Sequence, residues 1–110
     1  MKYNFLIDTA LPTAFLKRGV THRASKRRKD LFFKTALGMM ETLYNHPSVV
    51  YYTIFNEGWG QFGEKQCYER LKNADDSRIF DTTSGWFKKN CTDVESDHVY
   101  FKKIKTKKKI

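Results

Sequence analysis

The feature that most constrains the fold of this chain is a continuous seven-residue run from Val49 to Phe55. The run is rich in β-branched and aromatic side chains, and no charged residue interrupts it. Runs of this kind are typical of strands that are covered on both faces, as the strands of parallel sheets are. We therefore predict that residues 49–55 form a buried parallel strand.

Helical periodicity precedes and follows this strand. From Asp30 to Tyr44 apolar residues recur at three- and four-residue spacing, which predicts an amphipathic helix that ends at Asn45-His46-Pro47. A second helix is predicted from Glu64 to Ala74. The apolar faces of the two helices are predicted to hold Phe33, Ala36, Leu37, Met40, Leu43 and Tyr44 in the first, and Cys67, Tyr68, Leu71 and Ala74 in the second.

Shorter segments complete the predicted architecture. Residues 1–16 are interpreted as a strand end and loop, and residues 17–29 as a solvated connection. Residues 79–83 form a strand-like run, and a further short strand is predicted around His98 to Phe101. Because strand, helix and strand follow one another, the fold class is α/β with a parallel sheet.

The formal charge of +9 lies mostly in two segments. Eight basic residues and only Asp30 occur between Lys17 and Lys34, and six lysines and no acid occur from Lys102 to the C-terminus. The remaining residues carry a small net negative charge. The basic run at residues 23–29 and the tail could bind nucleic acid, but no aromatic residue interleaves either run. We therefore interpret them as a solvated loop and a frayed end and do not expect a nucleic-acid partner.

Neither the cysteines nor the hydropathy of the chain indicates a secreted or membrane protein. Cys67 and Cys91 are too far apart for a Cys-x-x-Cys clip, and spacing also argues against a zinc site built from them and the histidines. Asn4, Asp8 and Pro12 interrupt any apolar stretch long enough for a secretion signal or a membrane span. We expect a cytoplasmic protein with no membrane partner, no metal and no cofactor.

The candidate functional residues follow directly after the predicted strands. In α/β folds, functional groups lie just beyond the carboxyl ends of the strands. Asn56 and Glu57 follow the buried run, Trp59 comes two residues later, and Trp86 follows the next strand. A carboxylate and an amide beside aromatic side chains predict a sugar-binding site. On spacing alone a solvated strand-end carboxylate is the favoured interpretation of Glu57, and the tryptophans could equally be core residues.

Several stretches resemble glycoside hydrolase family 2, the β-galactosidase and β-glucuronidase type. The match is strongest over residues 45–50 and 55–62, which resemble the acid/base segment in which an Asn-Glu pair ends barrel strand four. Residues 8–13, 81–86 and 97–101 also resemble segments of a bacterial branch of the family, in the same order. The resemblance implies an α/β fold in which residues 1–104 form part of a (β/α)8 TIM barrel, about strands three or four to six, followed by a lysine-rich tail at 105–110.

The resemblance also implies an activity and residue roles. It implies a retaining glycosidase in which Glu57 protonates the leaving oxygen and Asn56 holds the sugar 2-hydroxyl. Trp59 and Trp86 would stack on the sugar or wall the pocket, and His98 and Tyr100 would line it, although His98 could also be a structural histidine. The strand-seven nucleophile is missing, so we expect the chain to be inactive alone and to self-associate through open barrel edges. It would be a piece of a longer gene product, a remnant, or a divergent gene. The alternative is a small basic nucleic-acid-binding or interaction protein.

Overall fold

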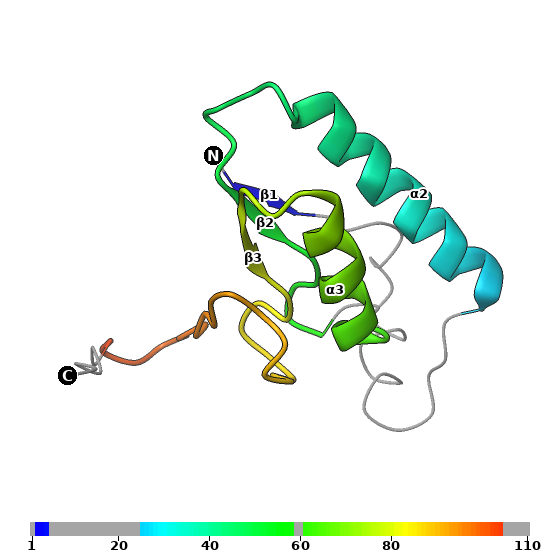
Figure 1. Ribbon diagram of the computed structural model, residues 1–110. Coiled ribbons are helices and arrows are strands. Elements are labelled where there is room, and N and C mark those ends of the chain that lie inside the picture. The colour runs from blue at the N-terminus through cyan, green and yellow to red at the C-terminus, as the bar shows by residue number, and fades with distance from the viewer. Residues whose placement is uncertain (1, 5–24, 59–60, 105–110) are drawn as a thin grey trace.

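The computed structural model describes residues 2–4, 25–58 and 61–104. Three short parallel strands form one sheet in the order β1-β2-β3. Two helices alternate with them along the chain (Figure 1). In chain order the elements are β1 (Lys2–Asn4), α2 (Lys26–Leu43), β2 (Tyr51–Thr53), α3 (Glu64–Ala74) and β3 (Ile79–Asp81).

The predicted βαβ unit is confirmed. Strand β2 pairs in parallel with β3 in a register that places Tyr52 opposite Phe80, and α3 connects the two strands. Strand β1 pairs in parallel with β2 on the other side, which agrees with a strand end near the N-terminus. The carboxyl ends of β2 and β3 therefore lie at the same edge of the sheet, where the predicted site residues follow them.

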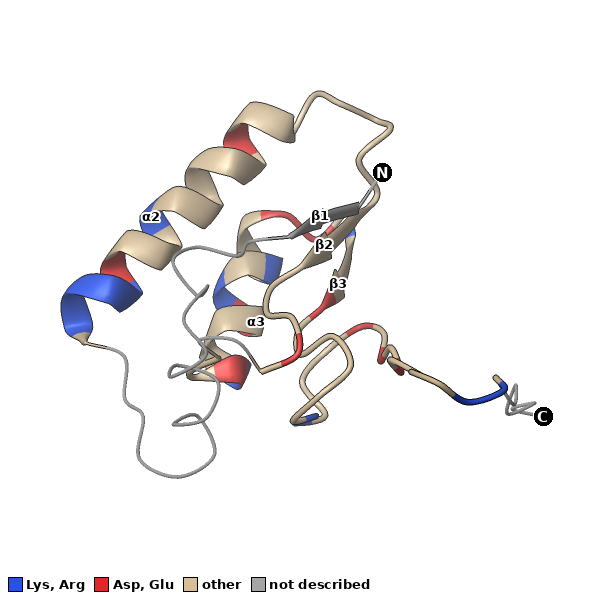
Figure 2. Cartoon of the chain, turned by 180° about the vertical axis from the view of Figure 1, so that it is seen from behind, with Lys and Arg blue, Asp and Glu red and all other residues tan. Residues whose placement is uncertain are grey.

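Helices α2 and α3 cover the same face of the sheet. Aromatic side chains pack against one another in the core between the helices and the sheet. The Phe32 ring stacks on the Phe55 ring, and the Phe80 ring contacts the rings of Tyr52 and, edge to face, Tyr68. Seen from behind, the strands lie in front of α3, and no described helix covers this second face (Figure 2). The buried hydrophobic residues of the core are Phe32, Phe33, Ala36, Met40, Val49, Tyr52, Ile54, Phe55, Cys67, Leu71 and Phe80.

Helix α2 begins at Lys26, earlier than the predicted Asp30. Ser25 is its N-cap, and the Ser25 hydroxyl accepts a hydrogen bond from the backbone N–H of Arg28 at 3.3 Å. This cap satisfies one of the unpaired N–H groups of the first turn, so the helix extends into the basic segment. The predicted apolar face is buried at Phe33, Ala36 and Met40, but Tyr44 lies beyond the helix and is 59% exposed.

Helix α3 has the predicted bounds, Glu64–Ala74. Its N-cap, Gly63, has a φ of +45°, a left-handed conformation that glycine adopts without the steric cost of a side chain. Cys67 and Leu71 are fully buried against the sheet as predicted. Ala74 was predicted to share this face, but it is exposed, because the buried face ends with Leu71 one turn before the helix does.

The amino end of the sheet is tied to α2 by a buried arginine, Arg78. Its guanidinium pairs with Asp75, and both side chains are almost fully buried. Burial alone would raise the pKa of Asp75, but hydrogen bonds from Ser77 and Arg78 outweigh burial, so the pKa lies below its ordinary value. Arg78 also donates hydrogen bonds of 2.6 to 3.3 Å to four backbone carbonyls, those of Leu43, Tyr44, His46 and Val49.

The run from Val49 to Phe55 is mostly, but not entirely, buried. Val49 and residues 52–55 are buried, whereas Val50 is 53% exposed and Tyr51 is partly exposed. On the neighbouring strand Ile79 is 44% exposed. The prediction of burial on both faces is therefore wrong for Val50 and Tyr51, which lie at the amino end of the run, before the fully buried residues 52–54.

The predicted strand around His98 to Phe101 does not form. The segment at residues 92–94 occupies the edge of β3 instead. The backbone N–H of Phe80 donates to the Asp93 carboxylate (2.9 Å), that of Thr82 donates to the Thr92 hydroxyl (3.0 Å), and the Phe80 carbonyl accepts from the backbone N–H of Asp93 (3.0 Å). Burial alone would raise the pKa of Asp93, but hydrogen bonds from Lys72, Tyr68 and the Phe80 N–H outweigh burial and lower it. Because residues 92–94 satisfy this edge of β3, the segment at 98–101 does not pair with it.

Candidate active site

Glu57 lies just beyond the carboxyl end of β2 and is fixed by the end of β3. Its backbone N–H donates a hydrogen bond to the carbonyl of Ser84 at 2.9 Å. The φ of Glu57 is +52°, an uncommon conformation for a residue with a side chain, which turns the backbone sharply after the strand. The peptide group that carries Glu57 is therefore held at the edge where the two strands end.

The carboxylate of Glu57 is held by two of the predicted site residues. Its Oε1 atom contacts Nδ1 of His98 at 2.7 Å and accepts a hydrogen bond from the Tyr100 hydroxyl. The side chains of His98 and Glu57 are 22% and 24% exposed, so the contact is sheltered but open to solvent. Residues separated by 41 and 43 positions in the sequence are brought together. They meet because the segment after β3 curls beneath the strand ends (Figure 1).

A glycine allows His98 to approach the end of β3. Gly85 has a φ of +89°, and a Cβ atom there would lie 2.5 Å from Cγ of the His98 ring. No residue other than glycine fits this position without displacing the ring. Gly85 was not predicted as part of the site, although its position directly after a predicted strand end was an available signal.

A second carboxylate, that of Asp81, lies behind this cluster and was not predicted as part of the site. Asp81 is 1% exposed, and its Oδ2 atom accepts hydrogen bonds from the hydroxyls of Tyr51 (2.8 Å) and Ser96 (2.6 Å). Burial, and after it the hydrogen bond to Asp81, holds the pKa of Tyr51 above its ordinary value, so this phenol keeps its proton and remains a donor.

The remaining predicted residues are placed as follows. Asn56 is partly buried beside Glu57. Trp86 is partly buried in the turn after β3, where its backbone N–H donates to the carbonyl of Thr83. Trp59 lies outside the described residues. Gln61, which was not predicted, is 1% exposed and joins Glu64 (2.8 Å) and the carbonyl of Phe87 (3.0 Å), so it links the loop after Glu57 to the loop after β3.

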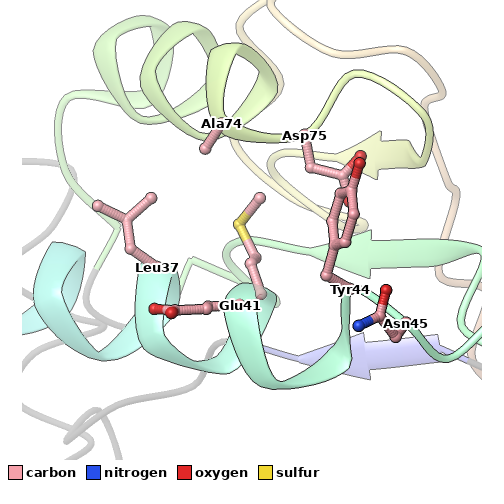
Figure 3. A pocket seen from close by; sticks show the side chains of 7 residues that line it. Leu37, Glu41, Tyr44, Asn45, Ala74 and Asp75 are labelled. Atoms are coloured by element: carbon pink, nitrogen blue, oxygen red, sulfur yellow. The ribbon is translucent and has the colours of Figure 1, made fainter.

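A groove of about 530 Å³ lies elsewhere, between α2 and α3 (Figure 3). Tyr44 and Asn45 line it where α2 ends, and Ala74 and Asp75 line it where α3 ends. In a parallel α/β unit, helices end near the amino ends of the strands that follow them. The groove therefore lies toward the edge of the sheet opposite to Glu57, and none of its lining residues belongs to the Glu57 cluster.

The described residues contain no group of three or more His, Cys, Asp and Glu side chains that could hold a metal ion. Both cysteines are free thiols, and burial raises the pKa of Cys67 to about 12, which keeps it protonated. Neither described helix has the length and apolarity that crossing a membrane requires. The described parts of the two basic segments, Lys26–Lys29 and Lys102–Lys103, lie on opposite sides of the molecule (Figure 2).

The fold and the site define a parallel α/β unit with a carboxylate, an imidazole and a phenol at its strand ends. A scan against protein-family models found no match to this chain, and a search of curated proteins also found none. The assignment to a family therefore depends on the resemblance of the motifs and on the geometry of Glu57, and is made as a proposal.

Proposed function

We propose that this chain is part of a retaining glycoside hydrolase that cleaves terminal β-linked sugars, and that Glu57 is its acid/base residue. The supporting observation is the position of Glu57 at the carboxyl ends of parallel strands, with Oε1 held by His98 and Tyr100. Acid/base catalysis requires a carboxyl group that is fixed in orientation and still reachable by a leaving group. Glu57 is about three-quarters buried and meets both requirements.

The two oxygens of Glu57 would have different tasks. Both contacts of the carboxylate within the described residues go to Oε1. Oε2 is thereby left to face the glycosidic oxygen, to which the acid would donate its proton as the bond to the sugar breaks. Asn56, next to Glu57, would hold the 2-hydroxyl, and Trp59 and Trp86 would wall the pocket.

The nucleophile of this reaction would come from another part of the barrel. Retaining hydrolysis needs a second carboxyl group about 5 Å from the first, on the other side of the anomeric carbon. Asp81 does not suit that role, because it is 1% exposed and two hydroxyls donate to its Oδ2. No acidic residue follows Asp97 in the sequence. We therefore expect the chain by itself to turn over no aryl β-galactoside or β-glucuronide.

Binding tests the proposal without requiring turnover. The ¹⁵N-labelled chain would be titrated with galactose- and glucuronide-configured iminosugars, whose cations resemble the oxocarbenium-like transition state. Binding should shift the backbone amide signals of Asn56 and Glu57 and the ring signals of His98. The substitution Glu57→Gln should abolish these shifts. Glu41→Gln, at an exposed site on α2, should bind as the parent does. Binding that is unaffected by Glu57→Gln, or no movement of these signals, would remove the assignment.

A further inference from the structure

An unbroken chain of hydrogen bonds connects the two carboxylates of the site. From Asp81 Oδ2 it passes to the Ser96 hydroxyl at 2.6 Å, and from there to the Ser84 hydroxyl at 3.2 Å. It continues from Ser84 to Nε2 of His98 at 3.1 Å, and from Nδ1 of His98 to Glu57 at 2.7 Å. Hydroxyls and imidazoles can donate or accept, so the direction of each bond has to be worked out from the number of protons.

The direction is set at the Asp81 end. An ionised carboxylate only accepts hydrogen bonds, so Ser96 uses its single proton to donate to Asp81. Ser96 can then only accept from Ser84, and Ser84 uses its own single proton for that bond. With its proton committed, Ser84 can only accept at its other contact, which makes Nε2 of His98 the donor there.

At the other end, Nδ1 of His98 faces Glu57, and two arrangements satisfy every bond. If Glu57 is ionised, Nδ1 must also donate, and His98 is an imidazolium. If Glu57 is a carboxylic acid, its proton is donated to Nδ1, and His98 is neutral with the proton on Nε2. The arrangements differ only in the position of one proton between Nδ1 and Glu57.

We propose that Asp81, Ser96 and Ser84 make Nε2 of His98 a permanent hydrogen-bond donor, so that Nδ1 of His98 and the carboxyl group of Glu57 share one proton. Asp81, Ser96 and Ser84 are then positioning residues that act through His98. The consequence for catalysis depends on the proposed function: His98 would store the proton that Glu57 gives to a leaving group and recovers from water.

The contacts that Ser84, His98 and Glu57 make with one another could suggest a different chemistry. In Ser-His-acid hydrolases one histidine is hydrogen-bonded to a serine hydroxyl through Nε2 and to a carboxylate through Nδ1. In those enzymes the serine donates its proton to the histidine and attacks a carbonyl carbon. Here Ser84 is fully buried, and its proton is directed to Ser96. Ser84 is therefore an acceptor for His98 and not a nucleophile.

The test is to locate the protons on His98 in the complete 110-residue chain at pH 7 by long-range ¹H–¹⁵N NMR of the histidine rings. His22→Gln and His46→Gln assign the signals of His98 by elimination. In the parent chain Nε2 should carry a proton and resonate as a pyrrole-type nitrogen. Ser96→Ala frees the Ser84 hydroxyl to donate to Nε2. The Nε2 proton should then be lost, and Nε2 should shift to the pyridine-type range while Nδ1 keeps its proton.

Two further variants separate this account from a packing effect. Asp81→Asn keeps the shape of the side chain but can donate to Ser96, so it should reverse the chain and also remove the Nε2 proton. Ser48→Ala, in the connection before β2 at the amino edge of the sheet, should leave the His98 signals unchanged. Backbone amide spectra would show that each variant keeps the fold.

The proposal fails if Nε2 of His98 lacks a proton in the parent chain. It also fails if Ser96→Ala and Asp81→Asn both leave the proton in place. The measurement contains no sugar, so its result does not depend on the proposed glycosidase activity. Conversely, absence of iminosugar binding together with the expected His98 spectra would overturn the activity and leave the proton arrangement standing.

Discussion

Replacing Arg78 with methionine should destabilise this fold more than replacing any other described arginine. Arg78→Met keeps most of the apolar stem but leaves Asp75, whose side chain is 3% exposed, as a buried charge without its partner. Breaking a buried ion pair in this way costs about 3–5 kcal/mol. Four backbone carbonyls also lose the hydrogen bond from the guanidinium, although those of Leu43 and His46 keep a backbone N–H donor.

This cost is large beside the stability of a small domain, about 5–15 kcal/mol. With a loss of about 4 kcal/mol and a urea dependence of about 2 kcal/mol per molar, the midpoint of unfolding should fall by about 2 M. The assay is equilibrium urea unfolding followed by circular dichroism and tryptophan fluorescence.

Arg70→Met is the matched control. The Arg70 guanidinium lies over the Phe33 ring at 4.1 Å on the surface of α3, a contact worth about 0.5–1 kcal/mol. Arg78→Met combined with Asp75→Leu should recover part of the loss, since it removes the unpaired charge but does not restore the guanidinium hydrogen bonds to the carbonyls. Equal losses for Arg78→Met and Arg70→Met would refute the reasoning.

Three further predictions concern the site, acid stability and the tail. Gly85→Ala should move the NMR signals of the His98 ring, because its Cβ would meet that ring, whereas Gly38→Ala, where a Cβ meets no atom within 4 Å, should not. Asp75 and Asp93 have pKa values below the ordinary 3.8, so their stabilisation is complete above about pH 4 and is lost as pH falls through the lowered values. Urea midpoints should drop over that range, less so in Asp75→Asn, and an unchanged acid response in that variant would contradict the assignment. Deleting residues 105–110 should leave iminosugar binding unchanged, and submicromolar, salt-sensitive binding of DNA or RNA by the intact chain would instead favour the nucleic-acid alternative.

The parallel βαβ unit and helix α3 could be predicted from the sequence because they depend on local periodicity. The start of α2 was missed because it is decided by a single cap, Ser25, which lies outside the apolar pattern. The strand predicted at residues 98–101 was wrong because residues 92–94 satisfy the edge of β3 with side-chain and backbone hydrogen bonds. No periodic pattern reports that kind of contact.

The candidate site was predicted in part. Glu57 followed from its position after a buried strand. Tyr100 followed from its place in the last predicted strand and from the family resemblance, and His98 from the resemblance. Asp81, Ser84 and Ser96 were not predicted, because their roles arise from hydrogen bonds between residues 12 to 15 positions apart across two loops. Only the folded chain brings Ser84 to Nε2 of His98 and Ser96 to Asp81.

The central claim is that Glu57 is a proton donor to a leaving group. The most direct measurement compares the parent chain with Glu57→Gln in an enzyme assembled from this chain and a polypeptide that supplies the remaining strands and the nucleophile. Hydrolysis of glycosides with poor leaving groups should slow far more than hydrolysis of activated aryl glycosides, because a good leaving group needs little protonation. Equal slowing of both substrate classes would contradict the account.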